Sequence, residues 1–195
     1  IRSRGNALTA GDVGYRYVVQ ALLDNGASDV LFDMNSRYDV PGYGYQLACG
    51  ETALAESWMS KDYLSHNHCM LGHLYSWLFN GLGGLSQAPG SVGYKEVVID
   101  PQVVGDIRSA RVAFESPYGL IRSEWNDTPQ TFRQTVEIPG NASALVYLPT
   151  ADPEAISENG QPLDRIEGIT VERKGDRTVL HIGSGAVSYT PLTLP

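Results

Sequence analysis

The spacing of apolar residues changes near residue 90, and this change most constrains the fold. Before it, apolar residues recur every three or four positions, which is typical of amphipathic helices. After it they alternate every second position, as in strands that are buried on one face. The sequence therefore predicts an α+β chain with two domains, a helical one over residues 1–88 and an antiparallel β-sandwich over residues 92–190, joined by the linker QAPGSVG at 87–93.

Capping and turn residues place the helices of the first part. Asp12 is expected to be the N-cap of a helix whose apolar stripe is Val13, Tyr17, Val18, Ala21 and Leu22. Asn25-Gly26 should end this helix, because Asn and Gly tolerate the left-handed conformation of a helix C-terminus. Further expected elements are a helix carrying Val30, Leu31 and Met34, a shaped loop PGYGYQLACG at 41–50, a helix-prone stretch at 52–59, and a longer helix from Ser65 or Asn67 that Gly81-Leu82-Gly83-Gly84 closes.

Turn signals divide the second part into short segments with no helix between them. The expected strands are Glu96–Ile99, Ser109–Glu115, Leu120–Trp125, Thr131–Ile138, Ala144–Leu148, Ile169–Arg173, Thr178–Ile182 and Ala186–Tyr189. Lys174-Gly175-Asp176 predicts a hairpin between two of them. The prolines of PLTLP at 191–195 make that segment a poor strand.

Charge and composition exclude some classes of partner. The formal net charge is −8, and no basic stretch is present to neutralise phosphates, which argues against binding to nucleic acid or to an anionic membrane. No apolar run approaches the ~18 residues of a membrane span. The two cysteines, Cys49 and Cys69, are too few for a disulfide framework.

Chemically versatile side chains gather between residues 43 and 77. Glu56 beside Trp58 offers a carboxylate and an aromatic ring, the groups that glycoside hydrolysis and sugar stacking need. Glu51 lies five positions away, about 140° around a helix, so the two glutamates make a poor acid/base pair. From composition alone, solvated surface glutamates are the more economical interpretation.

Histidines in the same region suggest a metal site as an alternative. His66, His68 and His73, with Cys69, are suitable ligand types for zinc. Their spacing does not put them on one helix face, so hydrogen-bonding histidines in a polar groove are favoured and no metal or cofactor is expected.

Ordered motifs give the chain a family resemblance. The segments GYGYQLACGETALAESW, SHNHCMLGHLYSWLFNGLGGL, GYKEVVIDPQ, FESPYGLIRSEW and VEIPGNASALVYLP together resemble the C-terminal part of bacterial α-L-rhamnosidases of glycoside hydrolase family 78. The resemblance implies the last helices of an (α/α)6 toroid followed by a C-terminal β-sandwich. It also implies hydrolysis of terminal α-L-rhamnosyl residues with inversion of configuration.

The resemblance also implies roles for individual residues. The family's W-E-x-W element falls on Ala55-Glu56-Ser57-Trp58, so Glu56 stands at the general base, while Ala55 departs from the family's aromatic. The S-x-N-H element matches residues 65–68, which implies that His68 contacts sugar hydroxyls. Trp58 and Tyr45 are the expected aromatic lining, and Glu51 receives no role.

Length implies that much of such a toroid lies outside this chain. Twelve helices of ~12 residues with ~5-residue connections need roughly 200 residues, twice what precedes the strands. The family's general acid would lie in the absent part, so the chain alone is expected to be inactive. Its partners would be a rhamnose-containing glycoside and either the missing N-terminal part or another copy of the chain. The parent could be periplasmic, extracellular or cytoplasmic.

Two other functions remain open. The β-sandwich could be a carbohydrate-binding module, with Tyr118, Trp125 and Tyr147 as a stacking platform. Alternatively it could be purely structural and buttress the toroid without touching sugar.

Overall fold

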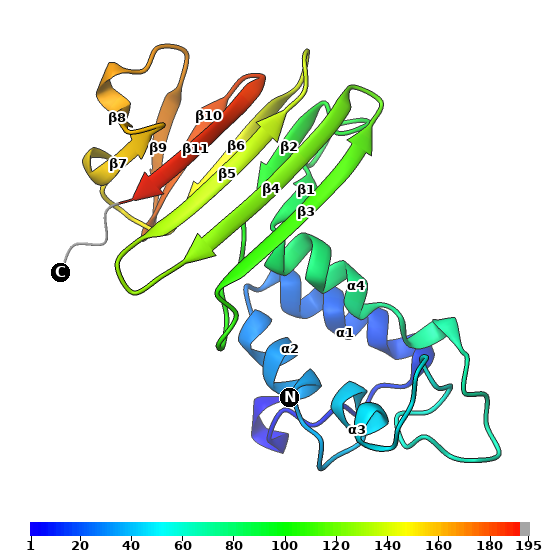
Figure 1. Ribbon diagram of the computed structural model, residues 1–195. Coiled ribbons are helices and arrows are strands. Elements are labelled where there is room, and N and C mark those ends of the chain that lie inside the picture. Colours follow the sequence, from blue (N-terminus) through cyan, green and yellow to red (C-terminus); the bar gives the residue numbers. More distant parts are fainter. Residues whose placement is uncertain (192–195) are drawn as a thin grey trace. The chain divides into compact units, whose positions relative to one another are not determined.

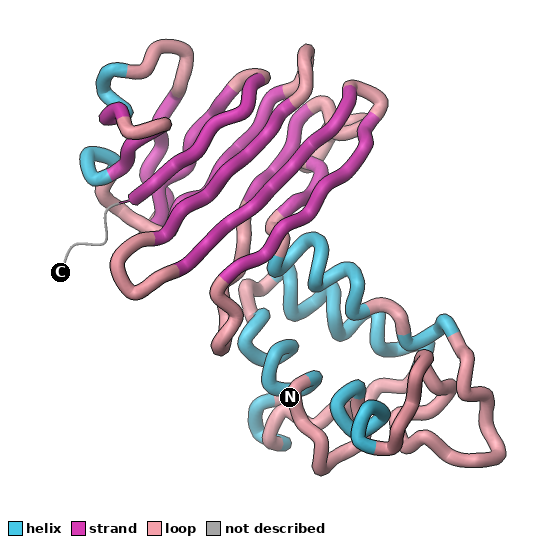
Figure 2. The backbone as a smooth tube through the Cα atoms, in the orientation of Figure 1, coloured by secondary structure: helices cyan, strands magenta, loops and turns pink. Residues whose placement is uncertain are grey.

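Helices and strands are segregated along the chain (Figures 1 and 2). The computed structural model describes residues 1–191. The chain divides into two compact units, Ile1–Leu78 and Phe79–Pro195. The first is helical and the second is built almost wholly of strands, which confirms the predicted α+β class.

The helical unit is formed by short helices and long connections. Its helices are α1 (Asp12–Asp24), α2 (Ser28–Asn35), α3 (Tyr43–Ala48) and α4 (Leu74–Ser76), with 3-10 turns at Arg2–Arg4 and Cys69–Leu71. A π-helical segment, Trp77–Leu82, continues from α4. No helix within residues 1–191 has both the length and the apolar character needed to cross a bilayer.

The buried face of α2 follows the sequence periodicity, whereas α1 buries a different face from the expected one, since Val13 and Tyr17 are both more than 60% exposed. Both helices bury one apolar stripe, formed by Tyr15, Val19 and Leu23 on α1 and by Val30, Leu31 and Met34 on α2. Asn25 follows α1 and Gly26 has φ +62°, as expected for this helix end.

Three expectations about which segments of this unit are helical are wrong. The glycine-rich stretch at 41–50 contains α3, and residues 52–59 form no helix. Residues 65–68 are irregular, so the longer helix expected there is reduced to a 3-10 turn, the single turn of α4 and the π-helical segment. Gly44 explains the first difference, because a Cβ at this position would lie 2.2 Å from the Arg37 carbonyl oxygen. This glycine permits close packing within a helix and does not mark a loop.

The β unit contains two sheets. The first has the order β1-β2-β6-β10-β9 and the second the order β3-β4-β5-β11-β7-β8. The strands are β1 (Leu85–Gln87), β2 (Glu96–Ile99), β3 (Ser109–Ser116), β4 (Gly119–Asp127), β5 (Phe132–Ile138), β6 (Ser143–Leu148), β7 (Ile156–Glu158), β8 (Gln161–Pro162), β9 (Thr170–Lys174), β10 (Arg177–Ile182) and β11 (Gly185–Pro191). Two 3-10 turns, Pro153–Ala155 and Leu163–Arg165, flank β7 and β8.

One hydrophobic core draws on both sheets. Buried residues alternate along the strands, as in β6, where every second side chain is buried. Val97, Val146 and Leu180 of the first sheet belong to the same buried cluster as Ile121 and Trp125 of the second. Trp125 is fully buried, and its Nε1 donates to the Leu82 carbonyl at 2.6 Å.

All eight predicted strands are present, with ends shifted by at most a few residues. Three short strands, β1, β7 and β8, were not predicted, and β1 lies inside the range 1–88 expected to be helical. The antiparallel expectation is wrong for one pair, because β2 and β6 run parallel. β11 extends to Pro191, so the expectation of a poor strand fails there, while residues 192–195 lie outside the described residues.

Candidate active site

Glu56 lies in an irregular segment that pairs with the Ser-His-Asn-His stretch. The backbone N–H of Glu56 donates to the Ser65 carbonyl at 2.8 Å, and that of His68 donates to the Leu54 carbonyl at 2.6 Å. The Ser65 N–H also donates to Glu56 Oε2 at 3.1 Å. The two motifs singled out in the sequence are therefore neighbours in space, joined by main-chain hydrogen bonds in place of a helix.

Gln46 of α3 fixes the backbone on both sides of Glu56. Its side chain is only 3% exposed. Its Nε2 donates to the Ser57 carbonyl at 3.1 Å, and its Oε1 accepts from the Ala55 N–H at 3.4 Å. These two hydrogen bonds satisfy backbone groups of the irregular segment that a regular helix would pair internally, so Glu56 projects from a fixed backbone. Sequence reasoning missed Gln46, because nothing in its local pattern marks a buried amide.

Trp58 is almost fully buried among other aromatic side chains. It is 8% exposed, and its Nε1 donates to the Ala10 carbonyl at 2.7 Å. Tyr15 and Tyr43 each meet the indole edge-on, with ring centroids 5.0 Å away. Burial raises the pKa of both tyrosines above the ordinary value, so both remain neutral hydrogen-bonding groups at neutral pH.

A cavity of about 450 Å³ opens beside this segment, and both Glu56 and Trp58 line it. Its volume falls within the roughly 300–1,000 Å³ typical of small-ligand sites. A second carboxylate, Asp12, also lines it, and the remaining walls are Leu8, Gly11, Pro41, Ser57, Met59, Leu64 and Leu71. Asp12 was expected only as an N-cap, which is wrong, because Gly11 is the N-cap and Asp12 is the first residue of α1. Its Oδ1 accepts from the Val13 N–H at 2.8 Å.

The other two predicted sugar-binding residues lie off the cavity wall. Tyr45 and His68 are half-buried, and neither is among the residues that line this cavity. The structure therefore brings two of the four predicted site residues, Glu56 and Trp58, to one cavity. His68 joins them through the backbone pairing of its segment.

Glu51 and His66 form a side-chain hydrogen bond that the sequence did not suggest. Glu51 Oε1 lies 2.7 Å from His66 Nδ1, and the glutamate side chain is 10% exposed. The pair ties the start of the Glu56 segment to the histidine segment. Among residues 1–191, no three His, Cys, Asp or Glu side chains are grouped so as to hold a metal ion, so His66, His68, His73 and Cys69 do not converge as the metal alternative required.

The aromatic residues of the β unit do not form the shared platform considered from the sequence. Trp125 is fully buried in the core. The Tyr147 ring faces two cations, with Arg177 Cζ 5.2 Å and Lys174 Nζ 5.7 Å from its centroid. Tyr118 is 38% exposed and remains available to a ligand.

Comparison with protein families assigns a known domain to each part of the chain. Residues 1–82 match the bacterial alpha-L-rhamnosidase 6 hairpin glycosidase domain, so the helical unit belongs to this class of domain. Residues 84–162 match the bacterial alpha-L-rhamnosidase C-terminal domain. The chain belongs to the bacterial α-L-rhamnosidase family, and the resemblance predicted from its motifs is confirmed.

Individual relatives agree with this assignment. An alpha-L-rhamnosidase of Streptomyces avermitilis is 28% identical over 192 residues, and one of Formosa agariphila is 26% identical over 196, covering 94% and 97% of this chain. The matches span only 18% and 21% of those proteins. The chain therefore corresponds to about a fifth of the length of these relatives.

Solved structures share the fold. The Streptomyces avermitilis alpha-L-rhamnosidase, solved with L-rhamnose, superposes with a TM-score of 0.84 at 28% identity over 97% of this chain and 18% of its own. The Dictyoglumus thermophilum alpha-L-rhamnosidase gives a TM-score of 0.85 at 24% identity over 96% of this chain and 21% of its own.

Proposed function

We propose that this chain is the C-terminal part of an inverting α-L-rhamnosidase, which hydrolyses terminal α-L-rhamnosyl residues, and that Glu56 is its general base. One observation carries the proposal. The Glu56 carboxylate lines a cavity of ligand size and projects from a backbone that Gln46 holds on both sides. A base that activates water must be held in place while keeping access to solvent, and Glu56 is exposed.

The remaining predicted site residues have supporting roles in this proposal. His68 would donate to or accept from sugar hydroxyls, and Tyr45 and Trp58 would supply apolar ring surface. Trp58 is well placed for this, because it already lines the cavity and its orientation is fixed by the Ala10 carbonyl. Ala55 is 2% exposed, so the aromatic wall that the family has at this position is absent from the cavity.

The chemistry requires a second carboxyl group from outside the chain. Inversion uses two carboxyl groups roughly 6.5–9.5 Å apart, one to protonate the leaving oxygen and one to activate water on the opposite face of the sugar. Glu56 supplies the second function only. Asp12 also lines the cavity, but its Oδ1 already accepts a hydrogen bond from the Val13 N–H. The general acid would therefore come from the part of the catalytic domain that precedes this segment.

In this proposal residues 1–88 are the closing part of an (α/α)6 toroid and residues 92–190 its C-terminal β-sandwich. The exposed apolar surface of the helical unit supports it. Large apolar side chains that are more than half exposed there are Val13, Tyr17, Tyr38, Leu47, Met59, Tyr63 and Tyr75. So many are unusual for a free surface, and the missing helices of a toroid would cover them.

Reconstitution tests the proposal. The chain alone should not hydrolyse an aryl α-L-rhamnoside. Placed in the Streptomyces avermitilis enzyme in exchange for the matching fifth of that protein, it should support turnover. Glu56→Gln should then lower kcat by about 10²–10⁴-fold, the usual contribution of a general base. Glu154→Gln, an exposed carboxylate of the β unit, is the matched control and should leave kcat unchanged. Robust turnover by the isolated chain, or equal kcat values for the two variants, would refute it.

A further inference from the structure

A groove of about 680 Å³ in the β unit is separate from the Glu56 cavity. Three loops form it, the one before β2, the β3–β4 turn at Tyr118 and the turn between β5 and β6. The lining residues are Pro89, Gly90, Ser91, Val92, Lys95, Glu96, Tyr118, Asn141, Ala142 and Ser143. Its size suits one or two sugar rings.

The groups around this groove suit a neutral polyhydroxylated ligand. Tyr118, with 38% of its surface exposed, offers an aromatic ring to the apolar face of a sugar. Within residues 1–191, the side chains of Lys95, Glu96 and Asn141 take part in no hydrogen bond or ion pair, so their donors and acceptors are open to a ligand. One cation and one carboxylate balance, which favours an uncharged ligand over an ion.

The loops that carry these side chains are held by their own hydrogen bonds. Ser91 Oγ accepts from the Glu96 N–H at 2.9 Å, and the Lys95 carbonyl accepts from the Ser143 N–H at 3.0 Å. Tyr94 and Asn141 both adopt φ +64°, a conformation that costs a non-glycine residue about 1–3 kcal/mol. The centroid of the Tyr94 ring lies 4.5 Å from that of Phe114, so the turn packs a partly buried Tyr94 against the core. A preorganised groove of this kind loses little entropy on binding.

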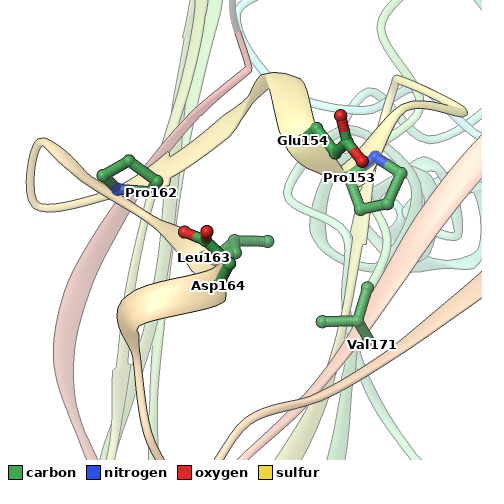
Figure 3. A pocket seen from close by; sticks show the side chains of 6 residues that line it. All are labelled: Pro153, Glu154, Pro162, Leu163, Asp164 and Val171. Carbon is green, nitrogen blue, oxygen red and sulfur yellow. The ribbon is translucent and has the colours of Figure 1, made fainter.

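A cavity of about 500 Å³ elsewhere in the β unit lacks these properties. Figure 3 shows its walls, formed by Pro153, Pro162, Leu163 and Val171 with the carboxylates of Glu154 and Asp164. It has no aromatic ring, hydroxyl or amide side chain in its lining and carries two like charges, so it provides a matched control.

We infer that the groove between Val92, Tyr118 and Asn141 is a second saccharide-binding site, which takes a neutral pyranoside by stacking on Tyr118 and by hydrogen bonding to Lys95, Glu96 and Asn141. This inference does not depend on Glu56 being catalytic. It assigns to the β unit a binding role that would hold a saccharide chain close to the enzyme.

Titration of the whole chain with methyl α-L-rhamnopyranoside, followed by backbone amide chemical shifts, tests this inference. Saturable shifts are expected at Lys95, Glu96, Tyr118 and Asn141, with a Kd near 1 mM, about −4 kcal/mol. Asn141→Gly should weaken binding at least fivefold, and it suits the positive φ of this position, so the fold is kept. Tyr118→Ala should abolish binding. The control Asp164→Asn and the catalytic variant Glu56→Gln should both leave it unchanged.

Several outcomes would overturn the inference. They are the absence of saturable groove shifts up to 100-fold above the expected Kd, an unchanged affinity in Asn141→Gly, or a preference for glucuronate over the neutral methyl glycoside. Shifts confined to residues around Glu56 would overturn it too, while supporting the proposed catalytic site. Groove binding that persists in a Glu56→Gln protein would support the second site even if the catalytic proposal failed.

Discussion

The two hydrogen bonds from the Gln46 side chain to the backbone of Ala55 and Ser57 give a quantitative prediction for the helical unit. Gln46→Met keeps the side-chain volume and removes both hydrogen bonds, leaving the Ala55 N–H and the Ser57 carbonyl without their partner. Each such loss costs about 1–3 kcal/mol when the group stays buried, and the 3.4 Å contact is the weaker of the two. We expect the free energy of unfolding of the helical unit to fall by about 2–3 kcal/mol. For a unit of this size the melting temperature should drop by about 10–20 °C.

Calorimetry and amide hydrogen exchange together measure this effect. The lower-stability transition should shift in Gln46→Met, and exchange of the Ala55 amide should accelerate by about 10-fold or more, the equivalent of 1.4 kcal/mol. Gln20→Met provides the control, because Gln20 is exposed on α1 and its Nε2 donates to Asp24 Oδ1 on the surface of the same helix. Its cost should stay below about 0.5 kcal/mol. Equal melting of both variants, with undiminished protection of the Ala55 amide, would show that Gln46 does not hold the Glu56 segment.

Two further predictions concern the stability of both units. Gly84→Ala should destabilise the β unit by about 2–4 kcal/mol, because φ is +70° and the new Cβ would lie 2.3 Å from the Pro101 nitrogen. The control Gly90→Ala has φ +81° but faces open space, so it should cost only about 1 kcal/mol. Denaturant unfolding measures both values. At alkaline pH, stability should fall as pH rises above about 10, the pKa of an unfolded tyrosine, because burial raises the folded-state pKa and only the unfolded chain then loses these protons. The tyrosines concerned are Tyr15, Tyr43 and Tyr189, three of the 11 in the chain. Absorbance titration should show these three ionising only when the chain unfolds, and their ionisation in the folded chain would contradict the prediction.

The β unit was largely predictable because its signals are local. Alternation and turn residues mark each strand within its own few residues, as at Gly175-Asp176 between β9 and β10, where Gly175 has φ +66°. The strands that escaped prediction are two or three residues long, and β8 ends in a proline. Strands this short carry too little alternation to be recognised. The parallel pairing of β2 with β6 depends on a long-range choice of neighbour.

The candidate site was predictable only in part. Motif resemblance identified Glu56 and Trp58, which line one cavity. The backbone around them was expected to be helical, whereas it is irregular and pairs with residues 65–68. Gln46 and Glu51 act through partners 11 and 15 positions away, so no local pattern shows their roles. Gly44 was interpreted as a loop residue, although its function is a close approach to the Arg37 carbonyl.

Chemical rescue tests most directly whether Glu56 activates the attacking water. In the reconstituted enzyme, Glu56→Ala removes the carboxylate from an exposed position and should abolish hydrolysis. Azide needs no base, so it should attack the anomeric carbon as the protonated aglycone leaves, restore turnover and give the β-rhamnosyl azide. Full hydrolysis by Glu56→Ala, or inactivity that azide does not relieve, would contradict the assignment of Glu56 as the general base.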